Sequence, residues 1–327
     1  MFLSIMYPSW IKPEIIPGFP LFRWYGLMYV FAFATAYLLF RYQVKKGELQ
    51  RAEGLSEPIT DDDVFSFFTW GILGLLIGAR IFAVYIYDTS GLYWHKPWLV
   101  FWPFTENGKW SGLQGMSYHG GFVGGLLGMI FWCLHHKHSI LAWCDTMGAS
   151  IPLGYTFGRL GNFLNGELYG RVTTSPIGMI FPSAPRFPLS AGWVQATVQK
   201  LGMQIPKGAA MVNLPRHPSQ LYEAFFEGII LWLIIWFVFR KRKTFNGFIT
   251  AIYTIGYGVF RFFIEYFREP DSDIGYRITV GGQPAPTYLY ESFFNISTGQ
   301  ILCLCMIVGG SIFLIINLIR FRKKNGN

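Results

Sequence analysis

Residues 157–171 read Phe-Gly-Arg-Leu-Gly-Asn-Phe-Leu-Asn-Gly-Glu-Leu-Tyr-Gly-Arg and follow directly on an apolar segment. Five polar or charged residues lie among four glycines here: Arg159, Asn162, Asn165, Glu167, Arg171, Gly158, Gly161, Gly166 and Gly170. Ionisable groups at the end of a membrane helix are costly and are usually kept for a function. Glycine lets the backbone approach a ligand closely or form turns that other residues avoid. A capped helix end with a solvated polar turn explains any one of these residues, but it explains the whole cluster poorly.

The composition around this stretch is that of a membrane protein. Of the 327 residues, 52% are hydrophobic and only 14% are charged, whereas a soluble chain carries about a quarter charged residues. The net charge of +9 would suggest a nucleic-acid partner in a soluble protein. Here the basic residues cluster between apolar segments, which indicates membrane topology. We therefore expect an all-α polytopic membrane protein with no nucleic-acid partner.

The four cysteines carry no sign of a metal site. They lie in or beside apolar segments, without a CxxC spacing or a nearby cluster of His and Asp. We interpret them as small core residues and expect no metal, no cofactor and no disulfide framework.

Seven segments approach the roughly 20 apolar residues that a helix needs to cross a bilayer. They are residues 21–40, 64–87, 117–134, 141–160, 219–239, 247–267 and 299–319. The segment 117–134 is short and rich in glycine, so it is either re-entrant or a close helix-packing face. This pattern predicts one integral membrane domain over residues 1–327, with insertions at 89–116, 161–218 and 269–298.

The basic residues predict the orientation. The loops after the first, third, fifth and seventh spans hold thirteen Lys and Arg, and the short segments on the other side, Lys109 among them, hold five. Since cytoplasmic loops carry the excess of positive charge, the N-terminus is predicted outside and the C-terminus in the cytoplasm.

Two insertions on the outer side have features of their own. Residues 161–218 contain seven prolines, which argue against a helix and predict a small folded or irregular module. Alternating Tyr276, Ile278 and Val280 predict a short hairpin within residues 269–298.

This topology brings unusual polar residues from six of the seven spans to one level, the outer leaflet. Among them are Arg80, His119, Arg159, Arg261, Glu265 and Arg268. Arg261 and Glu265 are four residues apart and are expected to pair. An excess of guanidinium groups in a membrane cavity suits an anion, and the planar fork of Arg suits phosphate. At that depth, a phosphate indicates a phospholipid headgroup.

These residues belong to seven short motifs: Gly158 to Gly170, Trp24 to Tyr29, Gly78 to Arg80, Met116 to Gly121, Arg216 to Glu223, Gly256 to Phe262, and Glu265 to Asp271. In these motifs the sequence resembles the bacterial phosphatidylglycerol:prolipoprotein diacylglyceryl transferases. The resemblance implies seven spans in the bacterial cytoplasmic (inner) membrane, with the active site toward the periplasm. It also implies transfer of the diacylglyceryl group of phosphatidylglycerol to the lipobox cysteine of a prolipoprotein signal peptide, with release of glycerol phosphate. This would be the first step of lipoprotein maturation.

The family's important residues fall on Tyr25, His119, Arg159, Asn162, Glu167, Gly170 and Arg261. We expect Arg159 and Arg261 to bind the phosphate, with Arg80 and Arg268 as supporting or structural charges. His119 is the expected base for the substrate thiol, with Glu265 or Glu167 as orienting or alternative groups. Asn162 and Asn165 are expected to hydrogen-bond the headgroup glycerol or the loop itself, and Gly170 to permit close backbone approach.

Two other classes remain open at this stage. A transporter or flippase for an anionic solute or lipid could use the same arginines as a binding site. Alternating access, however, predicts polar residues in both halves of the spans and repeat symmetry, and the inner halves are nearly free of charge. A structural scaffold leaves the glycine and arginine motifs unexplained.

Overall fold

The computed structural model describes residues 5–16, 18, 23–104, 115–270, 275–282, 286–324 and 326. Residues 21–22 of the first expected span, Lys109 of the charge count and Asp271 of the last motif lie outside the described residues.

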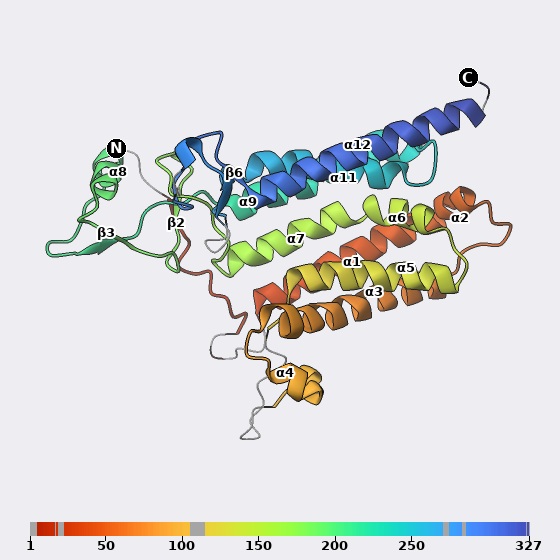
Figure 1. Cartoon of the computed structure of the whole chain (residues 1–327), viewed down its shortest axis with the longest axis horizontal. Helices are drawn as coiled ribbons and strands as arrows, with labels where there is room; N and C mark the ends of the chain where they lie inside the picture. The colour runs from red at the N-terminus through yellow and green to blue at the C-terminus, as the bar shows by residue number, and fades with distance from the viewer. Residues whose placement is uncertain are drawn as a thin grey trace. The chain divides into compact units, whose positions relative to one another are not determined.

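The described chain is mostly helical (Figure 1). The longer helices are α1 (Trp24–Lys45), α3 (Asp61–Phe82) with its π-helical extension η1 (Ala83–Tyr87), α5 (Tyr118–His135), α7 (Ile151–Leu164), α11 (Phe248–Ile264) and α12 (Thr298–Lys324). A further helix is continuous through α9 (Ser219–Glu223), η3 (Ala224–Ile230), α10 (Leu231–Leu233) and η4 (Ile234–Phe239). The shorter helices are α2 (Glu48–Glu53), α4 (Leu92–His95), η2 (Pro97–Phe101), α6 (Ile140–Gly148), α8 (Gly192–Leu201), η5 (Arg240–Arg242) and η6 (Val280–Gly282).

Four of the described helices are long and apolar enough to cross a membrane: Trp24–Lys45, Asp61–Tyr87, Ser219–Arg242 and Thr298–Lys324. Phe248–Ile264 is a shorter apolar helix. This confirms the expected class of α-helical membrane protein.

The single span expected at 141–160 is instead two helices, α6 and α7. The chain turns at Ala149 and Ser150, and the Ser150 N–H donates to the carbonyl of Met147 at 2.8 Å. Pro152 lies in the first turn of α7, where its missing N–H costs nothing, whereas inside a continuous helix its ring would clash with the preceding turn. Two helices with a turn between them therefore cover the segment that was expected as one span.

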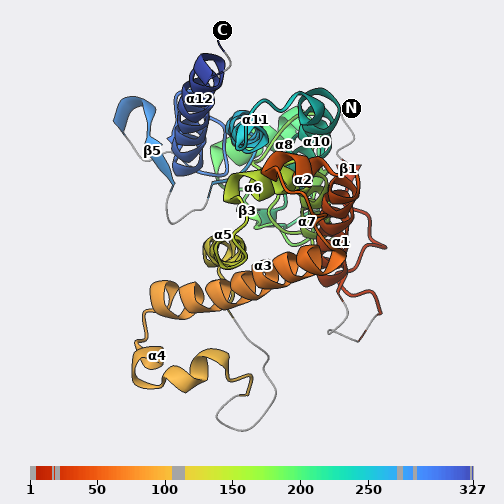
Figure 2. The same ribbon diagram turned by 90° about the vertical axis from the view of Figure 1, so that its right-hand side faces the viewer.

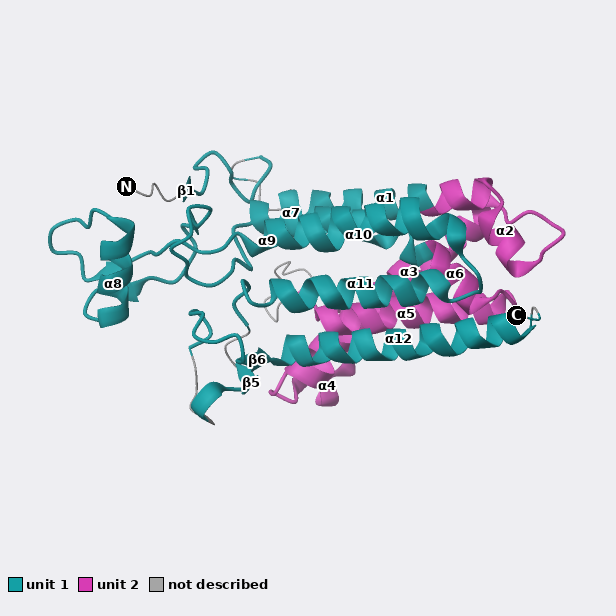
Figure 3. Ribbon diagram, turned by 90° about the horizontal axis from the view of Figure 1, so that it is seen from above, with its two compact units in different colours: residues 1–39, 147–327 teal, residues 40–146 magenta. Residues whose placement is uncertain are grey.

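The chain divides into two compact units (Figure 3), residues 40–146 and residues 1–39 with 147–327. In the first, α3 and α5 lie side by side (Figures 1 and 2). A Cβ added at Gly124 would lie 2.2 Å from the Gly74 carbonyl oxygen, and one at Gly78 would lie 2.4 Å from that of Gly120. The glycine-rich segment is thus a regular helix whose backbone packs directly on its neighbour, as one of the two expected alternatives proposed.

The larger unit contains α1, α7, α9, η3 and α11, and glycines allow close backbone contact between its helices as well. A Cβ at Gly228 of η3 would lie 2.1 Å from Thr156 Oγ1 of α7, and one at Gly154 of α7 would lie 2.6 Å from the Ala32 carbonyl oxygen of α1. Helices α11 and α12 run alongside each other (Figures 1 and 3). Close backbone approach leaves little room between these helices, so polar side chains that face inward must meet one another.

The segment between α7 and α9 forms a small folded part of the same unit, which we call the head module (residues 166–218 with strand β1). Strand β1 (Ile5–Met6) pairs parallel with β2 (Met179–Ile180), and β3 (Phe187–Pro188) pairs antiparallel with β4 (Met211–Val212). Val194, Leu214 and Phe187 are buried in its core. The module also contains α8, contrary to the expectation of no helix, because α8 occupies the proline-free stretch between Pro188 and Pro206.

The hairpin expected near the end of the chain is partly as predicted. Strand β5 (Tyr276–Ile278) pairs antiparallel with β6 (Ile296–Ser297), but Val280 lies in η6 and outside the strand.

Candidate active site

Two arginines from distant parts of the chain share one carboxylate oxygen. Arg159 Nε of α7 lies 2.9 Å from Glu223 Oε2 of α9, and Arg261 Nη1 of α11 lies 3.1 Å from the same atom. The Glu223 side chain is fully buried. Three helices that are remote in sequence therefore converge on one point inside the larger unit.

A second carboxylate and a phenol extend this cluster. Glu227, one helical turn after Glu223, accepts a hydrogen bond from the Tyr155 hydroxyl at 2.5 Å. Arg159 Nε in turn donates to that hydroxyl at 2.6 Å, and the Arg159 guanidinium lies 4.8 Å from the Tyr155 ring centroid. Tyr155 thus links the guanidinium to the second carboxylate.

The pairing expected between Arg261 of α11 and Glu265, the residue that follows this helix, is present. Arg261 Nη2 lies 3.0 Å from Glu265 Oε2, and Arg268 Nη1 lies 3.9 Å from the same oxygen. Glu265 Oε1 accepts from the Ser297 hydroxyl at 3.0 Å. Arg268 Nε is buried and makes no hydrogen bond to any described residue, so this guanidinium has a donor to spare.

The prediction of an excess of guanidinium groups over carboxylates is wrong for this cluster. Arg159, Arg261 and Arg268 are matched by the carboxylates of Glu223, Glu227 and Glu265. Sequence reasoning had assigned no role to Glu223 or Glu227. Two glutamates four residues apart inside an apolar span were a usable signal, since that spacing puts both on one helix face.

Polar residues of the stretch 157–171 form a hydrogen-bonded chain. Arg159 Nη1 donates to Asn162 Oδ1 at 3.4 Å, and Asn162 Nδ2 donates to Glu167 Oε1 at 2.9 Å. Asn165 Nδ2 donates to the other oxygen of Glu167 at 2.8 Å. Tyr25 packs against Gly161 of the same stretch, where an added Cβ would lie 3.5 Å from Tyr25 Cδ2. Its hydroxyl is 3.0 Å from that of Tyr29.

Gly170 approaches protein backbone closely. A Cβ there would lie 2.1 Å from the Phe267 carbonyl oxygen, and the Gly170 N–H donates to the His217 carbonyl at 2.7 Å. The next residue, Arg171, is buried and donates from Nε to the Arg268 carbonyl at 2.8 Å. These contacts join the head module to the end of α11.

His217 adjoins Arg171 in this junction. Its Nδ1 lies 3.2 Å from the Tyr222 hydroxyl. Burial, together with the positive charge of Arg171, lowers the pKa of His217 to about 4. The imidazole is therefore neutral at pH 7.

Two expected site residues, His119 and Arg80, belong to the smaller unit. His119, in the first turn of α5, places Nδ1 3.0 Å from the Tyr87 hydroxyl. Arg80 is buried in α3, donates to the carbonyls of Val100 and Gly115, and lies 5.4 Å from the Tyr93 ring centroid. Arg80 Nη2 also donates to the Tyr93 hydroxyl at 3.5 Å, and these contacts within the smaller unit indicate a structural role.

The long apolar helices define an α-helical membrane protein. Its larger unit contains a buried set of ion pairs, which we call the Arg–Glu cluster: Arg159, Arg261, Arg268, Glu223, Glu227 and Glu265. The family model for prolipoprotein diacylglyceryl transferase matches residues 14–316. A phosphatidylglycerol–prolipoprotein diacylglyceryl transferase of Treponema pallidum is 60% identical over 94% of this chain and 93% of its own. Proteins of the same name in Treponema denticola and Chlorobaculum tepidum are 56% identical over 100% and 99%, and 41% identical over 93% and 89%, of the two chains. The chain belongs to the prolipoprotein diacylglyceryl transferase family and is a transferase of lipoprotein biosynthesis.

Proposed function

We propose that this enzyme transfers the diacylglyceryl group of phosphatidylglycerol to the lipobox cysteine of a prolipoprotein signal peptide. The observation that carries this assignment is the convergence of Arg159 and Arg261 on one oxygen, Glu223 Oε2. Two guanidinium groups that meet at one anionic oxygen are spaced to meet at a phosphate oxygen as well. Glu223 holds the two guanidinium groups together, and their remaining N–H groups bind the lipid phosphate.

The reaction forms one carbon–sulfur bond and breaks one carbon–oxygen bond. The cysteine sulfur attacks the carbon of the diacylglycerol backbone that carries the phosphate ester. The bond from that carbon to the ester oxygen breaks, and the phosphate leaves with its headgroup glycerol and the bonding electrons as glycerol phosphate. Arg159 and Arg261, with the spare donor of Arg268, stabilise the negative charge that develops on the leaving phosphate. Asn162, Asn165 and Glu167 bind the headgroup glycerol, and Tyr25 lies beside them.

The thiol must lose its proton to become a nucleophile. His119 is the proposed base, with Glu265 or Glu167 as the alternatives. The contact of His119 Nδ1 with the Tyr87 hydroxyl leaves Nε2 for the thiol proton.

The proposed setting is the bacterial inner membrane. The chain crosses it seven times, with the N-terminus outside and the Arg–Glu cluster toward the periplasm. The excess of Lys and Arg in alternate loops supports this orientation.

The test is an assay of purified enzyme with labelled phosphatidylglycerol and a lipobox peptide. We expect the diacylglyceryl label on the peptide thiol as a thioether, with one glycerol phosphate released per thioether. Movement of labelled lipid between leaflets with no covalent product would contradict the proposal and favour a flippase.

The base is tested separately with His119→Gln. We expect the transfer rate to fall by about 10²–10⁴-fold, the range typical of a lost general base. His95→Gln, in the exposed helix α4, is the matched control. Near-normal transfer by His119→Gln would remove His119 from this role.

A further inference from the structure

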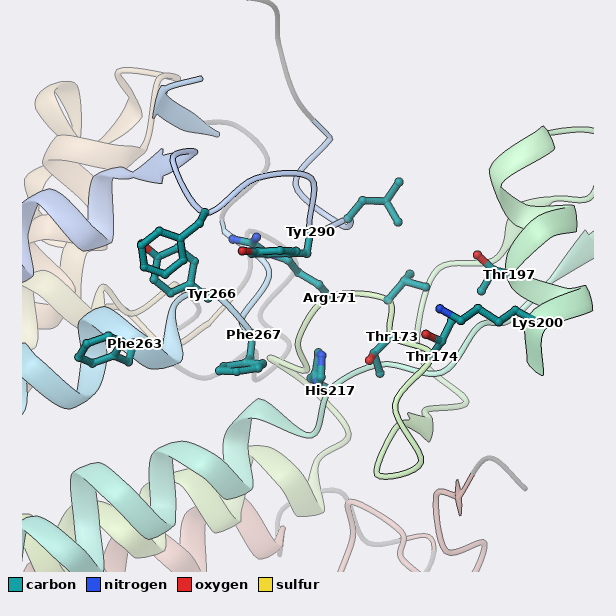
Figure 4. A pocket seen from close by; sticks show the side chains of 13 residues that line it. Arg171, Thr173, Thr174, Thr197, Lys200, His217, Phe263, Tyr266, Phe267 and Tyr290 are labelled. Carbon is teal, nitrogen blue, oxygen red and sulfur yellow. The ribbon is translucent and has the colours of Figure 1, made fainter. Parts of the chain in front are cut away.

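A cavity of about 720 Å³ lies between the head module and the end of α11 (Figure 4). Its walls come from three segments of the larger unit. Thr174 and Lys200 belong to the head module, Phe263 and Phe267 to the end of α11 and the turn after it, and Tyr290 to the loop before β6. This volume is within the range of ligand sites.

The cavity begins next to the Arg–Glu cluster. Arg171 lines it and also donates to the main-chain carbonyls of Glu265 and Arg268, at 3.2 and 2.8 Å. Arg171 therefore contacts both the cavity and the main chain of two residues of that cluster. From there the cavity extends to α8, the part of the head module that lies away from the long helices (Figures 1 and 3).

The described walls combine positive charge, hydroxyls and aromatic rings. Arg171 and Lys200 are cations, and none of the described lining residues is Asp or Glu. Lys200 has no ion-pair partner within the described residues, and its amine points toward Thr173 and Thr174 (Figure 4). On the opposite wall Tyr266 and Phe293 stack with centroids 4.4 Å apart. Such walls suit an extended peptide, with hydroxyls for its amides and cations for acidic side chains.

We infer that this cavity binds the substrate residues that follow the modified cysteine, with a preference for acidic side chains near Lys200. The inference rests on the proposed function. A prolipoprotein is held in the bilayer by its signal peptide, and its cysteine must reach Arg159 and Arg261. The chain after the cysteine then leads away from the helices, and the cavity beside Arg171 runs in that direction. The lipid's acyl chains take the opposite direction, into the bilayer.

The experiment compares lipobox peptides that carry two Glu or two Lys after the cysteine, with full-length enzyme and phosphatidylglycerol. We expect wild type to show a KM for the Glu peptide about 3–10-fold below that for the Lys peptide. Lys200→Glu should reverse this preference, as a change in the KM for the two peptides. Lys207→Glu, on the exposed turn after α8, is the matched control and should keep the wild-type preference. A peptide that ends at the cysteine should have the same KM in all three enzymes.

Two results would overturn the inference while leaving the reaction intact. One is an unchanged charge preference in Lys200→Glu. The other is a shift in the KM for phosphatidylglycerol in place of the KM for the peptides, which would assign the cavity to a lipid headgroup. Failure of wild type to form a thioether with any peptide would overturn the proposed function itself.

Discussion

At the level of single residues, Glu223 explains how two arginines can be stable side by side within a membrane protein. Like charges at this separation repel each other, and burying either alone is costly. The shared Oε2 atom offsets both effects and fixes the direction of each guanidinium. The two guanidinium groups are therefore held in place by contacts within the protein.

Arg159→Lys tests whether the shape of the cation matters as well as its charge. Lysine keeps the charge but cannot contact Glu223, Tyr155 and a phosphate through a planar fork. We expect transfer to slow by about 10²–10³-fold, measured as the single-turnover rate with saturating lipid. Arg186→Lys, at an exposed position of the head module, serves as the control and should stay within twofold. A rate for Arg159→Lys that matches this control would show that charge alone suffices.

His217 gives a prediction for pH. Its pKa is about 4 in the folded protein, against 6.5 for an ordinary histidine. As pH falls below about 6.5, the unfolded chain binds this proton first, so the free energy of unfolding decreases until about pH 4. Above pH 6.5 His217 contributes no pH dependence.

The measurement is the thermal midpoint of wild type, His217→Gln and the exposed-site control His95→Gln between pH 7.5 and 4. We expect His217→Gln to lose less stability on acidification than the other two. Parallel loss in all three proteins would contradict a neutral buried imidazole.

At the level of elements, the contact of α3 with α5 depends on the absence of side chains. Gly124→Ala places a methyl group 2.2 Å from the Gly74 carbonyl oxygen, so the helices must separate. We expect destabilisation of about 1–3 kcal/mol, measured by thermal unfolding in detergent. Gly309→Ala in α12, where nothing lies within 4 Å of the added Cβ, should be neutral or stabilising by up to about 1 kcal/mol. Equal stability of the two variants would disprove close packing.

At the level of the whole molecule, the proposed topology predicts which loops face the periplasm. In a background without native cysteines, Lys207→Cys in the head module should react with a membrane-impermeant maleimide added to spheroplasts. Glu57→Cys, after α1, and Lys243→Cys, after η5, should react only once the membrane is opened. Labelling of Lys207→Cys and Lys243→Cys on the same side would contradict an odd number of crossings between them.

The sequence alone predicted much of this architecture. Runs of apolar residues predicted α1, α3, α9 to η4, α11 and α12, because length and hydropathy are local properties of the chain. The spacing of Arg261 and Glu265 predicted their pairing, since helix geometry brings residues four apart together. The glycine spacing in residues 117–134 likewise offered a packed helix as one alternative.

Other features depended on contacts between residues far apart in the chain. Hydropathy did not reveal the break before α7, because Pro152 is compatible with a helix at its start and incompatible in its interior. The spacing of Glu223 and Glu227 places both on one helix face, but it does not identify Arg159 and Arg261 as their partners. A residue's charge is fixed by its identity. Its partner is fixed by which helices the glycine contacts bring together, and only the folded chain determines that.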